Sequence, residues 1–128
     1  MADTEKITIN MSVVDLGKVD LLVEEGFYSN RTDFIRSAIR SQLNRHEDSV
    51  KQTITRKSMV LGVLSYNHAD LKKVAARGEK IVCRVVGLLV IADDVPPELA
   101  QTVFQSIKVY GVMKANKAIQ QVLAGCME

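Results

Sequence analysis

A single alternating segment near the N-terminus places the strongest constraint on how this chain can fold. Residues 6–11, with the sequence KITINM, alternate polar and apolar side chains and include β-branched residues, a pattern typical of a half-buried β-strand. No second strand pattern occurs before residue 58. A lone strand leaves both of its edges unpaired, and so short a unit has little core of its own. The segment therefore predicts antiparallel pairing with its copy in a second chain, and hence an obligate dimer.

Two amphipathic helices are expected after this strand. The first begins at a Ser12 N-cap with Asp15 three residues later, and it ends at Gly26. The second is capped by Ser29 or Asn30 and runs to about Arg45. Apolar residues recur at helical spacing in both helices, namely Leu16, Val19, Leu22 and Val23 in the first, and Phe34, Ile35, Ala38, Ile39 and Leu43 in the second. The solvent face of the second helix is expected to carry Arg36, Arg40 and Asn44.

The paired strands would form a ribbon with two different faces. One face directs Ile7, Ile9 and Met11 toward the shared core, and the other presents Lys6, Thr8 and Asn10 as a doubled polar row. A two-stranded ribbon fits the major groove of B-DNA. The free N–H groups and the positive dipole at residues 29–32, where the second helix begins, predict a site for an anion such as a DNA phosphate.

The order of these features resembles a known family. An alternating strand, a helix stopped by glycine, and the segment 28–40 (YSNRTDFIRSAIR) are similar to the ribbon-helix-helix (MetJ/Arc/CopG) DNA-binding proteins. The resemblance implies that Lys6, Thr8 and Asn10 read base edges and that Ser29, Asn30 and Arg31 bind phosphate. It covers about 40 of the 128 residues.

Net charge alone says little about the partner. The 17 Lys and Arg against 15 Asp and Glu leave only +2, so no basic tail points to nucleic acid. The charges are nevertheless segregated, because residues 31–45 hold four arginines and one acid, whereas residues 15–25 hold four acids and one lysine. The arginines of the second helix could also pair with acids such as Glu24 and Glu25.

A polar connector, helical or flexible, separates this first part from an apolar second part. The chain is divided into a ribbon-helix-helix domain at residues 1–46, a connector at 47–57 and a small α+β domain at 58–128. The second part is expected to contain strands at 59–66, 80–92 and 108–113, and helices at 69–77, 97–107 and 115–123. Pro97 at a first helical position, after Asp93 and Asp94, fits a helix start.

This two-part order also resembles the nickel-responsive repressors, whose ACT-like domains bind metal and tetramerise. The resemblance implies an ACT-like or ferredoxin-like fold for residues 58–128. The metal site does not carry over, because the two histidines, His46 and His68, are far apart and Cys83 lies inside an apolar strand. We therefore expect no metal and no cofactor.

The sequence gives little support for catalysis, export or membrane insertion. The histidines and acids have no catalytic spacing, and no phosphate-binding glycine loop occurs, so the protein is expected not to be an enzyme and to have no catalytic residue. The longest apolar run is eight residues against roughly 20 for a membrane span, and no export signal is found. The expected location is the cytoplasm, with Cys83 and Cys126 reduced.

The leading hypothesis is a sequence-specific regulator of transcription, a repressor that binds double-stranded DNA as a homodimer or a dimer of dimers. The second domain would oligomerise or sense a small molecule or a partner protein. One alternative is an antitoxin or plasmid-maintenance protein whose C-terminal domain binds a partner, although such segments are often disordered until bound. Another is a protein interaction module that uses the strand only to dimerise.

Overall fold

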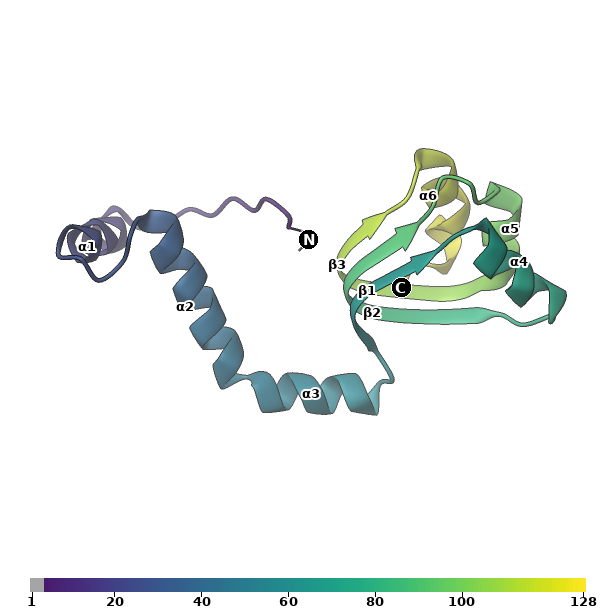
Figure 1. Cartoon of the computed structure of the whole chain (residues 1–128), viewed down its shortest axis with the longest axis horizontal. Coiled ribbons are helices and arrows are strands. Elements are labelled where there is room, and N and C mark those ends of the chain that lie inside the picture. The colour runs from purple at the N-terminus through teal and green to yellow at the C-terminus, as the bar shows by residue number, and fades with distance from the viewer. Residues whose placement is uncertain (1–3) are drawn as a thin grey trace. The chain divides into compact units, whose positions relative to one another are not determined.

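The computed structural model describes residues 4–128, which divide into two compact units. The N-terminal unit comprises Thr4–Thr53, and the C-terminal unit comprises Ile54–Glu128. The N-terminal unit contains helices α1 (Val13–Glu24) and α2 (Arg31–Arg45), and α3 (Glu47–Arg56) runs across the boundary (Figure 1). The connector is therefore helical. Within residues 4–128, each helix is too short or too polar to cross a bilayer.

The ends of α1 follow the signals predicted from the sequence. The backbone N–H of Asp15 donates to the hydroxyl of the Ser12 N-cap at 3.1 Å. At the other end Gly26 has φ +87°, in the region that glycine adopts without strain. The N–H groups of Gly26 and Phe27 donate to the carbonyls of Val23 and Leu22, which closes the last turn. Both predicted ends are confirmed.

The segment predicted as a strand has no regular structure within one chain. Residues 4–12 are neither helix nor strand, and the apolar side chains of Ile7 and Ile9 are 71% and 58% exposed. A β-strand exists only through hydrogen bonds to a neighbouring strand. None of the backbone groups of residues 4–11 bonds to the backbone of another described residue. The strand and its core-facing side thus remain predictions for two chains.

The N-terminal unit has almost no core of its own. Val19, at 3% exposure, is the one buried residue among residues 4–53. Large apolar side chains are instead exposed along the whole unit, namely Ile7, Ile9, Met11, Val13, Val14, Leu21, Phe27, Ile39, Leu43 and Val50. This amount of exposed apolar surface is characteristic of a protein surface that binds another protein.

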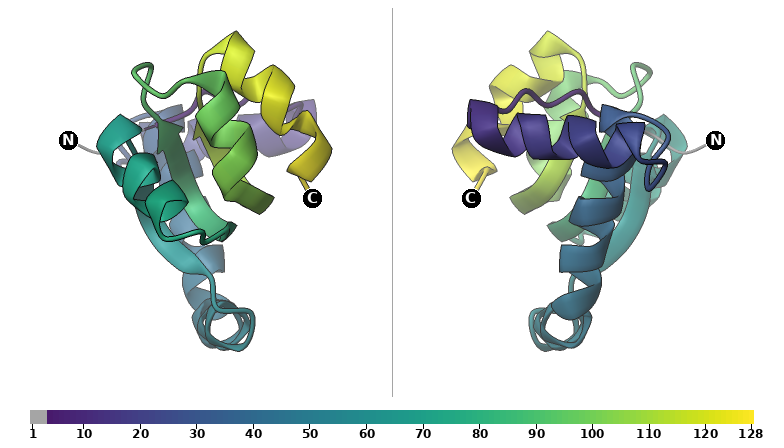
Figure 2. Two further views of the ribbon diagram at one scale, coloured as in Figure 1. Left: turned by 90° about the vertical axis from the view of Figure 1, so that its right-hand side faces the viewer. Right: turned by 90° about the vertical axis from the view of Figure 1, so that its left-hand side faces the viewer.

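The C-terminal unit is a three-stranded sheet with helices between its strands. Its elements in chain order are β1 (Val60–Tyr66), α4 (His68–Ala76), β2 (Ile81–Ile91), α5 (Pro97–Val103), β3 (Phe104–Lys114), α6 (Lys117–Leu123) and a 3₁₀ turn at Ala124–Cys126. The strands are parallel in the order β1-β2-β3. Both crossovers therefore step in the same direction, and α4, α5 and α6 lie on one face of the sheet (Figure 2). The opposite face, here called the open face, carries no helix of this unit.

This topology corrects the fold that the resemblance implied. The mixture of helix and strand is as expected, but a ferredoxin-like fold joins its second and third strands directly, without a helix. Here each pair of successive strands runs parallel and is connected through a helix. The unit therefore follows the βαβ rule, in which a helix returns the chain to the start of the next strand.

One boundary in the C-terminal unit was also predicted wrongly. The helix expected at 97–107 ends at Val103, and the strand expected at 108–113 begins at Phe104. Phe104 and Ile107 are 4% and 0% exposed, and they pair with Ile81 and Cys83 of β2 in the sheet. Tertiary packing overrides local helical spacing at these four residues.

The core of the C-terminal unit lies between the sheet and its three helices. The sheet contributes alternate residues such as Val85, Leu89 and Ile107, which are all fully buried. The helices contribute Leu71, Ile119 and Leu123, also at 0% exposure. Nearly all of the buried apolar residues described in the chain belong to this cluster. The C-terminal unit therefore has a hydrophobic core within one chain, which the N-terminal unit lacks.

A row of three glycines crosses the sheet. Gly62, Gly87 and Gly111 are register partners on the three strands, with φ of +117°, +136° and +125°. A Cβ on Gly87 would lie 2.2 Å from the carbonyl oxygen of Gly62, and one on Gly111 would lie 2.1 Å from that of Gly87. The strands curve strongly in this unit (Figure 1). Glycine is therefore required here both for its backbone conformation and for the close approach of neighbouring strands.

Substitutions along this row should separate the two requirements. We expect Gly87→Ala to destabilise the protein by about 3 kcal/mol or more, because it combines strained φ with a backbone clash. Gly62→Ala should cost about 1 to 3 kcal/mol, since its φ is strained but its Cβ position is open. Gly125→Ala, with open space and no positive φ, is the control and should change stability by less than about 0.5 kcal/mol. Urea unfolding followed by circular dichroism measures all three, and equal stabilities would contradict this explanation of the row.

Candidate nucleic-acid interface

The start of α2 is held by a reciprocal pair of hydrogen bonds. The Asn30 side chain accepts from the N–H of Asp33 at 2.8 Å, and the Asp33 carboxylate accepts from the N–H of Ser29 at 3.0 Å. Asn30 is thus the N-cap, which resolves the predicted choice between Ser29 and Asn30. Tyr28 packs edge-on against Phe34 with ring centroids 5.0 Å apart, so an aromatic pair supports this turn.

This capping arrangement limits how the start of α2 can bind an anion. The Ser29 amide and the Asn30 side-chain oxygen are already used inside the turn. Asp33 also places a negative charge in the first turn, where it interacts favourably with the helix dipole and opposes a second anion. The donors that remain for a phosphate at this turn are the backbone amides at the first helical positions and the side-chain N–H groups.

Arg31 forms an ion pair with an acid that was not named in the sequence analysis. Its Nε and Nη2 donate to the two carboxylate oxygens of Asp20 at 2.8 Å each, so the interaction is bidentate and joins α1 to α2. Glu24 and Glu25 were the acids suggested by the sequence for this helix, and the structure uses Asp20 instead. The choice depends on how α1 and α2 cross, which residue spacing within either helix does not reveal. Both side chains are about half exposed, so the guanidinium remains accessible to a further anion.

The pair shifts the titration of Asp20. The hydrogen bonds from Arg31 hold the pKa of the Asp20 carboxyl below its ordinary value of 3.8. A lowered carboxyl pKa contributes stability above the unfolded-state pKa, and this contribution is lost as the pH falls through the lowered value. The pair is therefore intact at neutral pH and is lost only under strongly acidic conditions.

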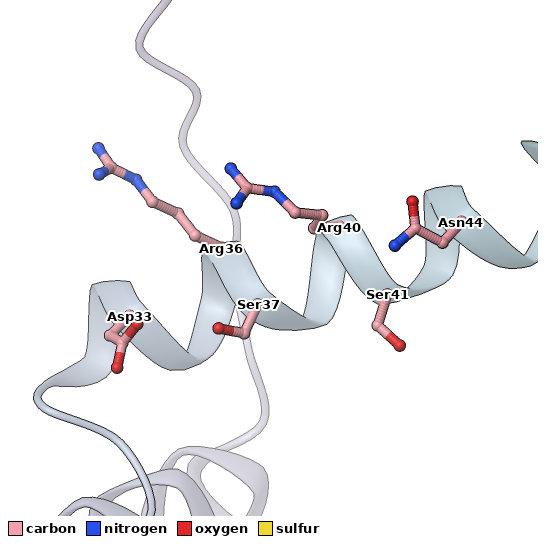
Figure 3. Close-up of a pocket in the computed structure, with 6 residues that line it drawn as sticks. All are labelled: Asp33, Arg36, Ser37, Arg40, Ser41 and Asn44. Carbon is pink, nitrogen blue, oxygen red and sulfur yellow. The ribbon is translucent and has the colours of Figure 1, made fainter.

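The polar residues predicted for the solvent face of α2 are exposed, although Ile39 and Leu43 of the predicted buried stripe are exposed in the single chain as well. Arg36, Arg40 and Asn44 are exposed and follow one another at single-turn spacing (Figure 3). With Asp33, Ser37 and Ser41 they border a shallow hollow of about 530 Å³ along the helix. The two guanidinium groups extend from the same side of the helix (Figure 3). This face presents two cations and one acid to solvent.

The predicted base-reading residues lie together on the extended N-terminal segment. Lys6, Thr8 and Asn10 are exposed, as are the apolar residues between them. In the single chain these three residues lie on one segment, but polar and apolar side chains are both exposed, so no separate polar face is defined. That distinction requires the ladder hydrogen bonds of a paired strand.

The histidines and cysteines occupy structural positions. His46 is the C-cap of α2, and the N–H of His68 donates to the Asp94 carboxylate at 3.1 Å. Burial raises the pKa of the Cys83 thiol, and also that of Cys126. Across residues 4–128, no group of three histidine, cysteine or carboxylate side chains is arranged to hold a metal ion.

Comparison with known proteins identifies the family. A profile described as the Ribbon-Helix-Helix transcriptional regulator family matches residues 2–120. The chain belongs to this family of transcriptional regulators. A curated relative, the transcriptional regulator CdrS of Halobacterium salinarum, is 34% identical over 44 residues, which cover 80% of that protein and 34% of this chain. No solved structure matched the chain.

The Asp20–Arg31 pair provides a test of whether Arg31 binds DNA. If it does, Asp20→Asn should strengthen binding to random duplex, because it removes a competing carboxylate while preserving side-chain size. Arg31→Ala should weaken binding and reduce the slope of log K against log salt by about 0.9 for each phosphate that is no longer neutralised. Fluorescence anisotropy over a salt series measures both, with Lys18→Gln on α1 as a control for removal of an exposed charge. Equal weakening by Asp20→Asn and Arg31→Ala would mean that the pair only orients the helices.

Proposed function

We propose that this regulator binds specific DNA sequences as a homodimer, with the N-terminal segments of two chains paired as a ribbon in the major groove. The observation that carries the proposal is the alternation of Lys6, Thr8 and Asn10 with Ile7, Ile9 and Met11 in a segment that has no partner strand in its own chain. Pairing would satisfy the backbone and bury the apolar residues at once. It would leave the polar row facing outward, where amide, hydroxyl and ammonium groups can bond to base edges.

Two classes of DNA interaction are assigned to different elements. Lys6, Thr8 and Asn10 are proposed to read bases. The start of α2, through its first amides and Arg31, is proposed to bind a phosphate and fix the orientation of the dimer. Ser29 and Asn30 belong to the same turn, and their engaged groups make them positioning residues for that phosphate. Arg36 and Arg40 add an exposed cationic face beside it.

The proposed regulator would act as a repressor by occupying its operator. An antitoxin role requires a partner-binding segment, which is often disordered before binding. Residues 54–128 instead have a core with many fully buried side chains. This order favours a stable assembly or sensing domain over a segment that folds on a partner.

A dimer of dimers is supported by the open face of the C-terminal sheet. Leu61, Val63 and Val82 are 66%, 61% and 52% exposed on the strands of this sheet. Parallel sheets are usually covered on both faces, so a further layer is expected there. Sedimentation of the full chain distinguishes a dimer from a tetramer.

The dimer proposal predicts that a charge introduced at one ribbon position disrupts the dimer and that the same charge at the adjacent position does not. In a fragment of residues 1–53, Ile9→Asp should convert a dimer to an unfolded monomer, because it buries a charge in the shared core. Thr8→Asp places the same charge on the opposite side of the strand and should leave the fragment dimeric at micromolar concentration. Analytical ultracentrifugation with circular dichroism measures both properties. A wild-type fragment that is folded and monomeric would overturn the paired ribbon.

The base-reading proposal predicts a loss of specificity without a loss of general affinity. Thr8→Ala and Asn10→Ala should each cost roughly 1 to 3 kcal/mol on a selected operator and little on random DNA. Random DNA is held through backbone charge, which these substitutions do not alter. Thr53→Ala in α3 removes a hydroxyl away from the ribbon and should bind both DNAs like the wild type. Unchanged operator binding by both ribbon variants would favour the interaction-module alternative.

A further inference from the structure

The open face of the C-terminal sheet contains a small hollow. It has a volume of about 250 Å³ and is lined by Lys57, Met59, Arg84, Lys108, Tyr110 and Glu128. It lies entirely within the C-terminal unit and shares no residue with the proposed DNA-binding elements.

The sheet register brings two cations side by side in this hollow. Arg84 of β2 and Lys108 of β3 are direct register partners. The neighbours of Arg84 along the strand, Cys83 and Val85, are 2% and 0% exposed in the core, so Arg84 itself projects from the open face. Like charges placed directly opposite on neighbouring strands are unfavourable. The fold nevertheless holds these two together.

Neither cation forms an ion pair with the side-chain carboxylate of another residue among residues 4–128. Arg84 Nη1 donates to the backbone oxygen of Lys57 at 3.2 Å, and Lys108 Nζ donates to that of Glu128 at 3.4 Å. The ion pairs found among residues 4–128 involve other residues, namely Asp20–Arg31, Glu47–Lys51 and Arg77–Glu79. The Glu128 carboxylate accepts a hydrogen bond from Ser106. The hollow thus contains three cationic side chains, counting Lys57, and one carboxylate side chain.

An aromatic surface lies beside these cations. The Tyr110 side chain is 46% exposed, and the Lys108 ammonium lies 5.2 Å from its ring centroid. Met59, half-buried, adds an apolar wall. A guanidinium with a neighbouring ammonium is suited to bind phosphate, and an exposed phenol ring is suited to stack on a flat ring.

We propose that this hollow binds a small phosphorylated molecule with a planar ring, such as a nucleoside monophosphate. Arg84 and Lys108 would bind the phosphate, and Tyr110 and Met59 would contact the ring. The volume is just under the roughly 300 to 1,000 Å³ of typical ligand sites, which favours one phosphate and one ring over a dinucleotide. Such a ligand would make the C-terminal unit the sensing part of the regulator. The proposal does not depend on how the ribbon reads DNA.

Calorimetric titration of the full chain, without DNA, tests the site. The probes are AMP and UMP, with ribose 5-phosphate as the phosphate lacking a base and adenosine as the base lacking a phosphate. We expect AMP or UMP to bind once per chain with Kd below about 1 mM, ribose 5-phosphate to bind at least about fivefold more weakly, and adenosine not to bind measurably. Arg84→Gln and Lys108→Gln keep a hydrogen-bond donor and should each weaken binding about tenfold. Lys72→Gln on α4 removes an exposed charge outside the hollow and should have no effect.

Thermal unfolding of each variant checks that the fold is retained. Absence of nucleotide binding at about 5 mM would overturn the proposal. Binding of the nucleotide by both the Arg84→Gln and the Lys108→Gln variant with wild-type affinity would also overturn it. Equal binding of ribose 5-phosphate and AMP would overturn the role of the ring. If nucleotides do not bind but Arg84→Gln weakens DNA binding, the hollow contacts the DNA backbone and the proposal fails, while the ribbon assignment remains open to its own tests.

Discussion

The backbone N–H and C=O groups of residues 4–11 form no hydrogen bond to the backbone of another described residue. The organisation of the N-terminal unit depends on how these groups are satisfied. Unpaired N–H and C=O groups can remain in water, but they then cannot accompany the apolar side chains beside them into a core. The proposed pairing with a second chain would remove both difficulties in one step. It would also cover apolar residues of the helices, because Ile39 and Leu43 of α2 are exposed in the single chain. The C-terminal unit differs because its core closes within one chain.

At the start of α2, the structure of the turn and the proposed binding of a phosphate require the same groups. Asn30 and Asp33 complete the cap, and Asp20 engages Arg31, so these groups first stabilise the turn and the crossing of the helices. A preorganised turn can position its remaining amides for a phosphate at little entropic cost. Exposed ion pairs are weak, so exchange of Asp20 for a phosphate at Arg31 is energetically small. Sequence discrimination is then left to the proposed ribbon.

Features encoded by neighbouring residues could be predicted from the sequence, and features that depend on distant residues could not. The helix N-cap Ser12 and the C-terminal glycine Gly26 form hydrogen bonds within one turn of the helix, and their positions were predicted correctly. The end of α5 was missed because Phe104 is fixed by packing against β2 rather than by local spacing. The parallel strand order, the pairing of Arg31 with Asp20 and the alignment of Arg84 with Lys108 all arise from residues distant in the chain. The roles of the ribbon and phosphate residues remain predictions.

The glycine row also fixes the alignment of the sheet. If one strand slipped by a single position, a side chain larger than glycine would meet the carbonyl that now faces Gly87 or Gly111. Slipped pairings are therefore rejected sterically at two positions, one at each of the two strand interfaces. Insertion or deletion of one residue before the glycine in any strand should be far less tolerated than the same change in a connecting turn. The glycine row therefore permits only one register between neighbouring strands.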